Sequence, residues 1–230
     1  MTTESVLLFL KRKGTKSNIE TMKHFGIKSP NAFGVNTPTL RKLAQQIGTD
    51  HRLALSLWKA GYHEARVLAS LIADPEKVTE RLMEQWVRDF DSWAICDACC
   101  AELFDNTPFA ISKAFEWSKN ETEYVKRAGF VMMAALAVHR KELDDGVFKK
   151  FFPVIEHESN DGRNFVKKAV NWALRQIGKR NTRLHAEAMK VAVKLSKQED
   201  STARWIGADA IKDLQSDAVR RKFARMKANL

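Results

Sequence analysis

Apolar side chains recur every three or four residues along almost the whole chain, which is the spacing of one buried face of an α-helix. Between Thr3 and Arg12, for example, Val6, Leu7 and Leu10 form a single stripe. Glycine and proline, which interrupt helices, number only 10 and 5 in 230 residues. The pattern predicts an all-α protein with short connections.

The longest irregular stretch in this pattern is Gly26–Asn36. A helix is expected to follow it, with Thr37 as the capping residue and Pro38 at the first helical position, where a missing N–H is tolerated. A polar residue followed by proline recurs at Asp74-Pro75 and Thr107-Pro108, so these positions are also predicted to begin helices.

After residue 50 the predicted helices come in pairs joined by short turns. The pairs are Asp50–Ala60 with Tyr62–Ala73, Lys77–Phe90 with Asp91–Phe104, Pro108–Lys119 with Thr122–His139, Asp145–Glu158 with Arg163–Lys179, and Thr182–Ser196 with Ser201–Leu214. Equivalent positions on the second helices are Arg66, Cys96, Arg127, Lys168 and Trp205, at intervals of 30, 31, 41 and 37 residues. This spacing indicates a structural repeat.

Helix pairs of this length stack side by side, because each pair buries its apolar face against its neighbours. We therefore predict an all-α, right-handed α-solenoid of HEAT-like helix pairs, in which the second helices line a concave basic surface. A single domain is expected over residues 1–230, with capping helices in 1–48, helix pairs in 50–214 and a C-terminal helix in 217–228. A compact bundle is the alternative.

Positive charge is concentrated in the last third of the chain. The net charge is +11, and residues 161–230 hold 17 lysines and arginines against 7 acidic residues, a net of +10. Segregated positive charge is typical of a surface that binds a polyanion, although a solvated helix surface is the alternative. No run of eighteen apolar residues is present and the first residues do not resemble a secretion signal, so no membrane segment is expected.

Three cysteines, Cys96, Cys99 and Cys100, lie within five residues on one predicted helix. They include one C-x-x-C, but no second cysteine pair and no nearby histidine that would complete a metal site. We interpret them as small core residues and expect no metal and no cofactor. Clustered thiols in an odd number favour a reducing compartment, so the expected location is cytoplasmic.

The predicted helix that follows Asp91 or Ser92 contains a carboxylate, Asp97, one turn after Trp93. A carboxylate in an apolar helix needs a partner, and the candidates are Arg127 and the basic run from Arg163 to Arg183. We interpret Trp93, Asp97, Arg127 and Trp172 as lining the concave surface where it contacts nucleic acid.

A tryptophan on an apolar helix is more often a core residue, and we assign Trp58, Trp86 and Trp117 to the core. Taken together, however, two aromatic planes, a carboxylate and an arginine suit a cationic lesion. Aromatic planes stabilise a positively charged base or sugar, and a carboxylate stabilises an oxocarbenium ion and orients water. Basic side chains nearby would neutralise DNA phosphates; the candidates are Lys126, Arg163, Lys167, Lys168, Arg175, Lys179 and Arg180.

Three segments, Asp91–Asp97, Val125–Ala128 and Phe165–Arg175, resemble the HEAT-like DNA alkylation repair glycosylases of the AlkD type. Gly34–Pro38 is similar to the start of the first full repeat in that family. The resemblance spans Asn18 to Leu214.

The resemblance implies a monofunctional DNA glycosylase that acts on duplex DNA containing alkylated bases. It would hydrolyse the N-glycosidic bond of cationic N3- or N7-alkylated purines and leave an abasic site, without flipping the base into a pocket. By this resemblance Asp97 is the catalytic carboxylate, Arg127 lies beside it, and Trp93 and Trp172 contact the lesion nucleotide. We expect a monomer that needs no cofactor.

Two features depart from the family pattern. Ala94 stands where relatives often carry a second acid, and the loop Phe25–Phe33 matches poorly. The sequence leaves open the preference between N3-alkyladenine and N7-alkylguanine. Two further functions stay open: a non-catalytic HEAT-type scaffold that binds nucleic acid, and a solenoid that binds proteins.

Overall fold

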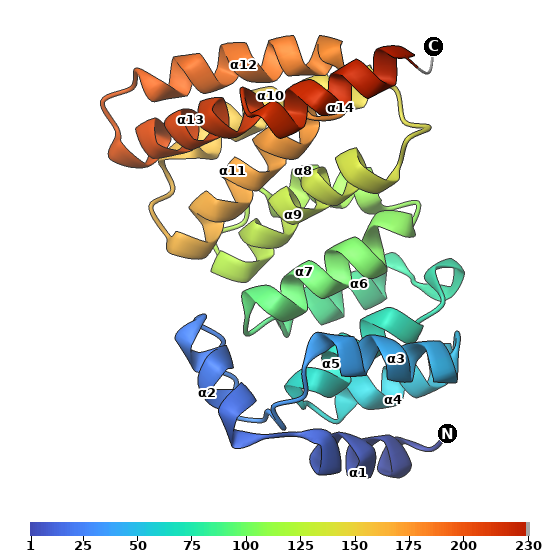
Figure 1. The fold of residues 1–230 in the computed structure, drawn as a ribbon. Helices are drawn as coiled ribbons and strands as arrows, with labels where there is room; N and C mark the ends of the chain where they lie inside the picture. The colour runs from blue at the N-terminus through green and yellow to red at the C-terminus, as the bar shows by residue number, and fades with distance from the viewer. Residues whose placement is uncertain (229–230) are drawn as a thin grey trace. The chain divides into compact units, whose positions relative to one another are not determined.

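The computed structural model describes residues 1–228 and is entirely helical over that range, with fourteen α-helices and three short 3₁₀-helices (Figure 1). The prediction of an all-α protein is confirmed. Over the same residues, none of the helices combines the length and the apolar character that crossing a bilayer would demand.

The helices gather in two compact units, which we call the N-terminal and C-terminal units. The N-terminal unit, Met1–Phe109, contains α1 (Thr3–Lys13), α2 (Lys16–His24), α3 (Thr37–Ile47), α4 (His51–Lys59), α5 (His63–Ile72), η1 (Pro75–Lys77), α6 (Glu80–Arg88), α7 (Trp93–Glu102) and η2 (Phe104–Asn106). The C-terminal unit begins at Ala110 and contains α8 (Ala110–Trp117), α9 (Glu123–His139), α10 (Asp145–His157), η3 (Glu158–Asn160), α11 (Asn164–Gly178), α12 (Thr182–Ser196), α13 (Ser201–Leu214) and α14 (Asp217–Ala228).

Most of the helix pairs predicted from the sequence are present within the two units. Consecutive helices pack together as α4 with α5, α8 with α9, and α12 with α13. The second helices also pack on one another: α5 contacts α7 in the N-terminal unit, and α9, α11 and α13 lie side by side in the C-terminal unit (Figure 1). Each unit is therefore a stack of helix pairs. The handedness, the concave surface and the single domain remain predictions.

The capping predictions were partly wrong. Asn36, not Thr37, caps α3, because Asn36 is extended and its Oδ1 accepts from the N–H of Thr39 at 3.0 Å. Asp74 does precede a helix, although it is only the 3₁₀-turn η1. Thr107 starts no helix, since its hydroxyl donates to the carbonyl of Phe104 at 2.7 Å and ends η2, so that α8 begins at Ala110.

The core contains the cysteines and tryptophans that were assigned to it. Cys96, Cys99 and Cys100 are free thiols with no exposed surface, and burial raises the pKa of Cys99 and Cys100. The indoles of Trp58 and Trp86 are buried and stack with ring centroids 3.9 Å apart, and Trp117 is buried as well. The interpretation of these six residues as core is confirmed for each.

Two pairs in the C-terminal unit share a close backbone contact at a glycine. A Cβ on Gly129 of α9 would lie 2.2 Å from the backbone nitrogen of Ser118, and a Cβ on Gly207 of α13 would lie 2.3 Å from that of Ser196. Each glycine follows the serine that it approaches by eleven residues. The repeat positions Arg127 and Trp205 each precede the glycine of their helix by two residues. The contact therefore supports the repeat register read from the sequence.

We expect Gly129→Ala to destabilise the protein although alanine is the better helix former. Helix propensity favours the change by about 1 kcal/mol. The added methyl group, however, meets backbone that has no room to yield, and overpacking costs roughly 2–3 kcal/mol. Urea unfolding should therefore show a net loss of about 1–2 kcal/mol. Gly162→Ala is the matched control, because a Cβ added there would lie 3.6 Å from its nearest neighbour, the hydroxyl oxygen of Thr202, which is an ordinary van der Waals contact. Equal stability of the two variants would contradict the close contact.

Candidate functional site

The candidate residues of the N-terminal unit lie on α7. Ser92 caps this helix, Trp93 is its first residue, and Asp97 follows one turn later, so that both side chains leave the helix on one face. The indole N–H of Trp93 donates to the carbonyl of Phe25 at 2.9 Å. Both side chains are half-buried. The aromatic plane beside Asp97 is thus fixed by backbone from a distant part of the sequence.

The segment that supplies this carbonyl, residues 25–36, is held against the starts of α5 and α7. The hydroxyl of Ser29 donates to the carboxylate of Asp91 at 3.2 Å, and the N–H of His63 donates to the carbonyl of Asn31 at 2.8 Å. The ring of Phe33 stacks on that of Tyr62. The sequence pattern alone indicates no role for this loop. The length of this irregular stretch is the only feature of the sequence that sets it apart, and nothing in the sequence indicates its contact with Trp93.

A buried carboxylate organises the end of this loop. Glu64 has no exposed surface and accepts three backbone hydrogen bonds, from Phe33 at 2.9 Å, Gly34 at 2.6 Å and Val35 at 3.1 Å. Gly34 has a φ of +80°, and a Cβ there would lie 2.3 Å from the carbonyl oxygen of Thr15, so only glycine presents its N–H in this way. Three charge-assisted hydrogen bonds offset the cost of burying the acid.

The candidate residues of the C-terminal unit lie on α9 and α11. Arg127 is only 6% exposed, and its Nη1 donates to the carbonyl of Phe165, in the first turn of α11, at 2.6 Å. Trp172 follows Phe165 by two helical turns and therefore leaves α11 on the same face; it is half-buried. The structure brings Arg127 and Trp172 onto neighbouring helices, and Trp93 and Asp97 onto one helix. That all four act at one site remains a prediction.

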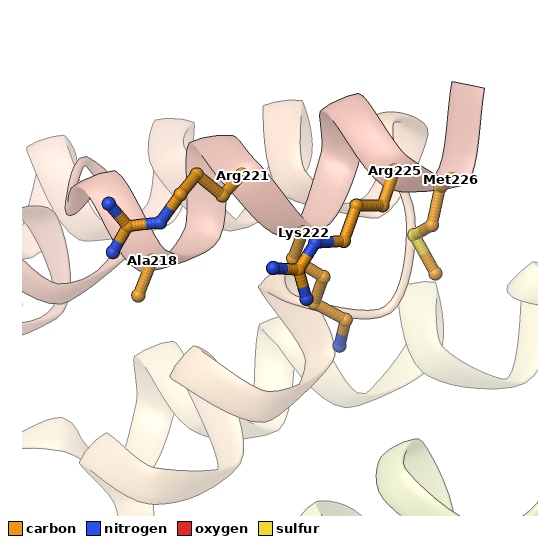
Figure 2. A pocket seen from close by; sticks show the side chains of 5 residues that line it. All are labelled: Ala218, Arg221, Lys222, Arg225 and Met226. Carbon is orange, nitrogen blue, oxygen red and sulfur yellow. The ribbon is translucent and has the colours of Figure 1, made fainter. Parts of the chain in front are cut away.

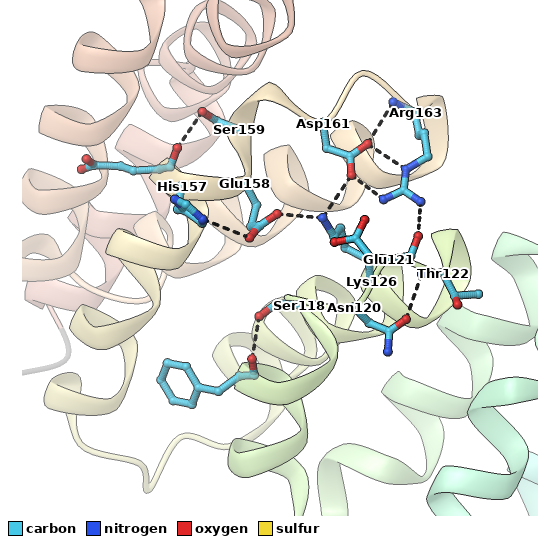
Figure 3. Close-up of polar contacts among 12 residues, drawn as sticks. Ser118, Asn120, Glu121, Thr122, Lys126, His157, Glu158, Ser159, Asp161 and Arg163 are labelled. Atoms are coloured by element: carbon cyan, nitrogen blue, oxygen red, sulfur yellow. Dashed lines mark hydrogen bonds and ion pairs between the residues drawn. The ribbon is translucent and has the colours of Figure 1, made fainter.

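Two of the predicted DNA-binding residues belong to an ion-pair network between α9 and the start of α11 (Figure 3). The ammonium of Lys126 lies 2.8 Å from Glu158 and 3.3 Å from Asp161, and the guanidinium of Arg163 lies 2.5 Å from Asp161 and donates to the carbonyl of Glu121 at 2.6 Å. The hydrogen bonds from Arg163 lower the pKa of Asp161 to about 2. The charges of Lys126 and Arg163 are thus compensated within the protein.

Arg180 is also engaged internally. Its guanidinium lies 4.3 Å from the ring centroid of Phe148 and donates to the carbonyls of Ala137, Lys141 and Leu143 at 3.3, 2.8 and 2.7 Å. It is buried, and burial lowers its pKa. These contacts join the turn that follows α11 to the end of α9, to the turn after α9 and to α10.

Further along α11, basic side chains meet the acidic residues of α13. Arg175 lies 3.5 Å from Asp209 and 3.7 Å from Asp213, and Lys179 lies 2.6 Å from Asp213. These pairs, like the Lys126 network, reduce the positive field that the sequence suggested. The charge count alone gave no indication of this compensation.

Lys167 and Lys168 differ from the other predicted residues, because neither has an ion pair with any residue in the part of the chain that the structure describes. Lys168 is exposed, and the ammonium of Lys167 lies 5.2 Å from the ring centroid of Trp205. Trp205 itself is 40% exposed on α13 and occupies the repeat position of Arg127. The sequence pattern identifies Trp205 only as a repeat position, and its exposure makes it a candidate contact residue.

Within residues 1–228, no group of three or more histidine, cysteine, aspartate or glutamate side chains is arranged to hold a metal ion. The three cysteines are of a residue type that binds metals, but they are buried in the core. His63 is buried as well, and burial lowers its pKa.

A family model described as DNA alkylation repair enzyme matches residues 6–214. No curated protein matches the chain. Among solved structures, the chain is similar to a member of a new family of proteins related to the HEAT-like repeat DNA glycosylases with affinity for branched DNA structures. The TM-score is 0.78 at 19% identity, over 92% of this chain and 95% of that one, and it confirms the HEAT-like fold. A designed armadillo repeat protein in complex with a (KR)4 peptide has a TM-score of only 0.38 at 17% identity, over 82% and 80%.

We expect Glu64→Gln to loosen the loop that contacts Trp93. Glutamine keeps the shape but replaces one acceptor oxygen by a donor, which leaves at least one buried N–H without a partner and costs about 2 kcal/mol. Urea unfolding measures the loss, and hydrogen exchange at residues 33–35 should accelerate. Glu76→Gln, at an exposed position of η1, is the control and should change neither quantity. Unchanged exchange in Glu64→Gln would contradict the anchoring role.

We expect Asp161→Asn to lower stability by about 2 kcal/mol near neutral pH, because one pKa unit corresponds to about 1.4 kcal/mol. The folded-state pKa, about 2, lies below the ordinary value of 3.8. The stabilisation is therefore fully present above about pH 5 and is lost as the pH falls towards 2. Urea unfolding at about pH 7, 4 and 3 should show the two proteins converging on acidification. The exposed pair of Asp217 with Arg220 supplies the control, Asp217→Asn, with little effect at any pH.

Proposed function

This chain belongs to the DNA alkylation repair enzyme family, and from that membership we propose that it is a monofunctional glycosylase for cationic N3- and N7-alkylated purines in duplex DNA. It hydrolyses the N-glycosidic bond and leaves an abasic site, as a cytoplasmic monomer without metal or cofactor. The positive charge of the alkylated base already makes that base a good leaving group, so little further activation is needed.

The observation that carries the proposal is the placement of Asp97 one turn after Trp93 on α7, with the indole held by the carbonyl of Phe25. As the glycosidic bond breaks, the sugar acquires oxocarbenium character. A carboxylate held close to it stabilises that charge and positions the attacking water, and an aromatic face adds cation–π attraction. Fixing the indole before the substrate arrives removes part of the cost of ordering the site.

We assign supporting roles to the pair on the C-terminal unit. Trp172 offers a second aromatic surface to the backbone or sugar of the lesion nucleotide. Arg127 helps to keep the catalytic carboxylate ionised, since a guanidinium favours the charged form of an acid. The carbonyl of Phe165 fixes one end of the Arg127 guanidinium, which restricts its orientation.

Binding to the DNA backbone is assigned first to Lys167 and Lys168, with Trp205 as an aromatic contact beside them. Phosphate contacts of this kind give salt-sensitive binding without sequence preference. The other predicted basic residues already have partners within the protein, so we propose that they contribute to DNA binding mainly by holding in place the helices that present Lys167, Lys168 and Trp205. These residues are Lys126, Arg163, Arg175, Lys179 and Arg180.

A second candidate function is a non-catalytic scaffold that binds DNA by shape and charge. It is favoured by the likeness to a structure from a family with affinity for branched DNA. Such a scaffold would bind branched or duplex DNA in a salt-dependent way and release no base from methylated DNA. Base release therefore separates the two candidates.

We expect Asp97→Asn to reduce the excision of 7-methylguanine about tenfold or more, which is the scale of a lost electrostatic stabiliser, while DNA affinity stays nearly unchanged. Single-turnover release of the free base from methylated duplex measures the first quantity, and fluorescence anisotropy measures the second. Glu102→Gln is the matched control: it removes a carboxylate at the other end of α7, where Glu102 pairs with Arg41. Full activity of Asp97→Asn would refute the catalytic role, and a wild-type protein that binds but releases no base would support the scaffold.

A further inference from the structure

The last described helix, α14, carries a cationic pocket that lies outside the family match, which ends at residue 214. The pocket has a volume of about 400 Å³ and is lined by Ala218, Arg221, Lys222, Arg225 and Met226. Figure 2 shows the side chains of Lys222 and Arg225 extending to the same side of α14, where Met226 is also directed. Three of the five lining residues are thus basic, and none is acidic.

The positive charge at this pocket is not compensated nearby. Arg221, Lys222 and Arg225 form no ion pair with any other residue among 1–228; the acid of α14, Asp217, pairs with Arg220. Burial and the charge of Lys179 lower the pKa of Lys222, and burial with the charges of Lys222 and Arg180 lowers the pKa of Lys141. Lys222 therefore lies near other cations, of which Lys179 is itself paired with Asp213. The lack of ion pairs at the pocket cations within residues 1–228 contrasts with α11, where carboxylates of α13 meet the basic side chains.

The apolar side of α14 is already used within the C-terminal unit. Val219 is buried, and the ring of Phe223 contacts that of His185 on α12, with centroids 5.0 Å apart. A helix that inserts into a lipid surface needs a free apolar face, and here only Met226 is a large exposed apolar residue. The helix therefore presents cations on a surface without an apolar face, which favours a hydrophilic polyanion.

We propose that the α14 pocket, formed by Arg221, Lys222 and Arg225, binds backbone phosphates of a nucleic-acid strand as a second DNA contact. Guanidinium groups bind phosphate oxygens in a bidentate manner, and an ammonium adds a point charge, so this residue set suits phosphodiesters. The inference rests on the proposed function only for the identity of the anion. The site itself follows from the pocket and its unpaired cations.

The test compares two triple variants with equal loss of charge. Arg221→Gln/Lys222→Gln/Arg225→Gln removes the pocket cations, and Lys149→Gln/Lys150→Gln/Lys197→Gln removes three exposed lysines from α10 and the end of α12. Affinity for an unmodified duplex is measured by anisotropy over a range of salt concentrations. We expect the pocket variant to bind about tenfold more weakly and its salt dependence to fall by about two to three phosphate contacts. The control variant should keep the wild-type salt dependence.

A pocket variant that matches the control would overturn the proposal. The double variant Arg221→Lys/Arg225→Lys keeps the positive charges and should retain DNA binding. If all variants also have the circular dichroism spectrum of the wild type, the weaker binding of the pocket variant is due to lost charge and not to unfolding. Inorganic tripolyphosphate and vesicles of equimolar phosphatidylcholine and phosphatidylserine are tested in parallel. Pocket-dependent binding to either of these without pocket-dependent binding to DNA would also overturn it. Base excision is assayed separately, so that loss of the proposed enzyme activity and loss of this contact are distinct outcomes.

Discussion

Close approach of helix backbones determines what the C-terminal unit presents to a partner. Where α9 meets the end of α8, and α13 meets the end of α12, only a glycine fits, and each contact fixes the rotation of the second helix about its axis. A helix fixed in rotation presents a defined set of side chains. Arg127 and Trp205 occupy equivalent positions in this arrangement although one is buried and the other is exposed. The packing of the helices thus determines which way a side chain points, and the residue type at that position determines what the side chain can bind.

Charge in this protein has two separate uses. On α9 and at the two ends of α11, lysines and arginines meet carboxylates from η3, the following turn and α13, so these cations join helices to one another. Isolated buried charges would be costly, and pairing makes their burial possible. On Lys168 and on the exposed side of α14, cations have no such partners within residues 1–228. This second group is available to attract a polyanion at full strength.

The sequence predicted the architecture well because apolar periodicity is a local signal that repeats in every pair. The helices α12 and α13 have the predicted bounds, and the buried cysteines and the three core tryptophans followed from composition and spacing alone. Caps were less predictable, since Asn36 and Thr37 are both good capping residues and only the backbone conformation decides between them.

The candidate site residues remain a prediction, and the contacts that hold them in place were not predictable from the sequence. Nothing near Trp93 in the sequence indicates that its N–H reaches the carbonyl of Phe25, and nothing near Glu64 indicates three N–H partners from residues 33–35. Such contacts depend on where the chain returns after many residues. The neutralisation of Lys126 by Glu158 and Asp161 is of the same kind, because a net-charge count contains no distances.

The buried thiols have a consequence for a member of a DNA alkylation repair family. The electrophiles that methylate purines also attack cysteine, and they react with the thiolate rather than the thiol. Cys99 and Cys100 are sealed in the core with their pKa raised, and Cys96 is equally inaccessible. None of the three thiols is therefore a ready nucleophile in the folded protein. A member of a DNA alkylation repair family that is built in this way keeps its cysteines out of reach of the agents that alkylate DNA.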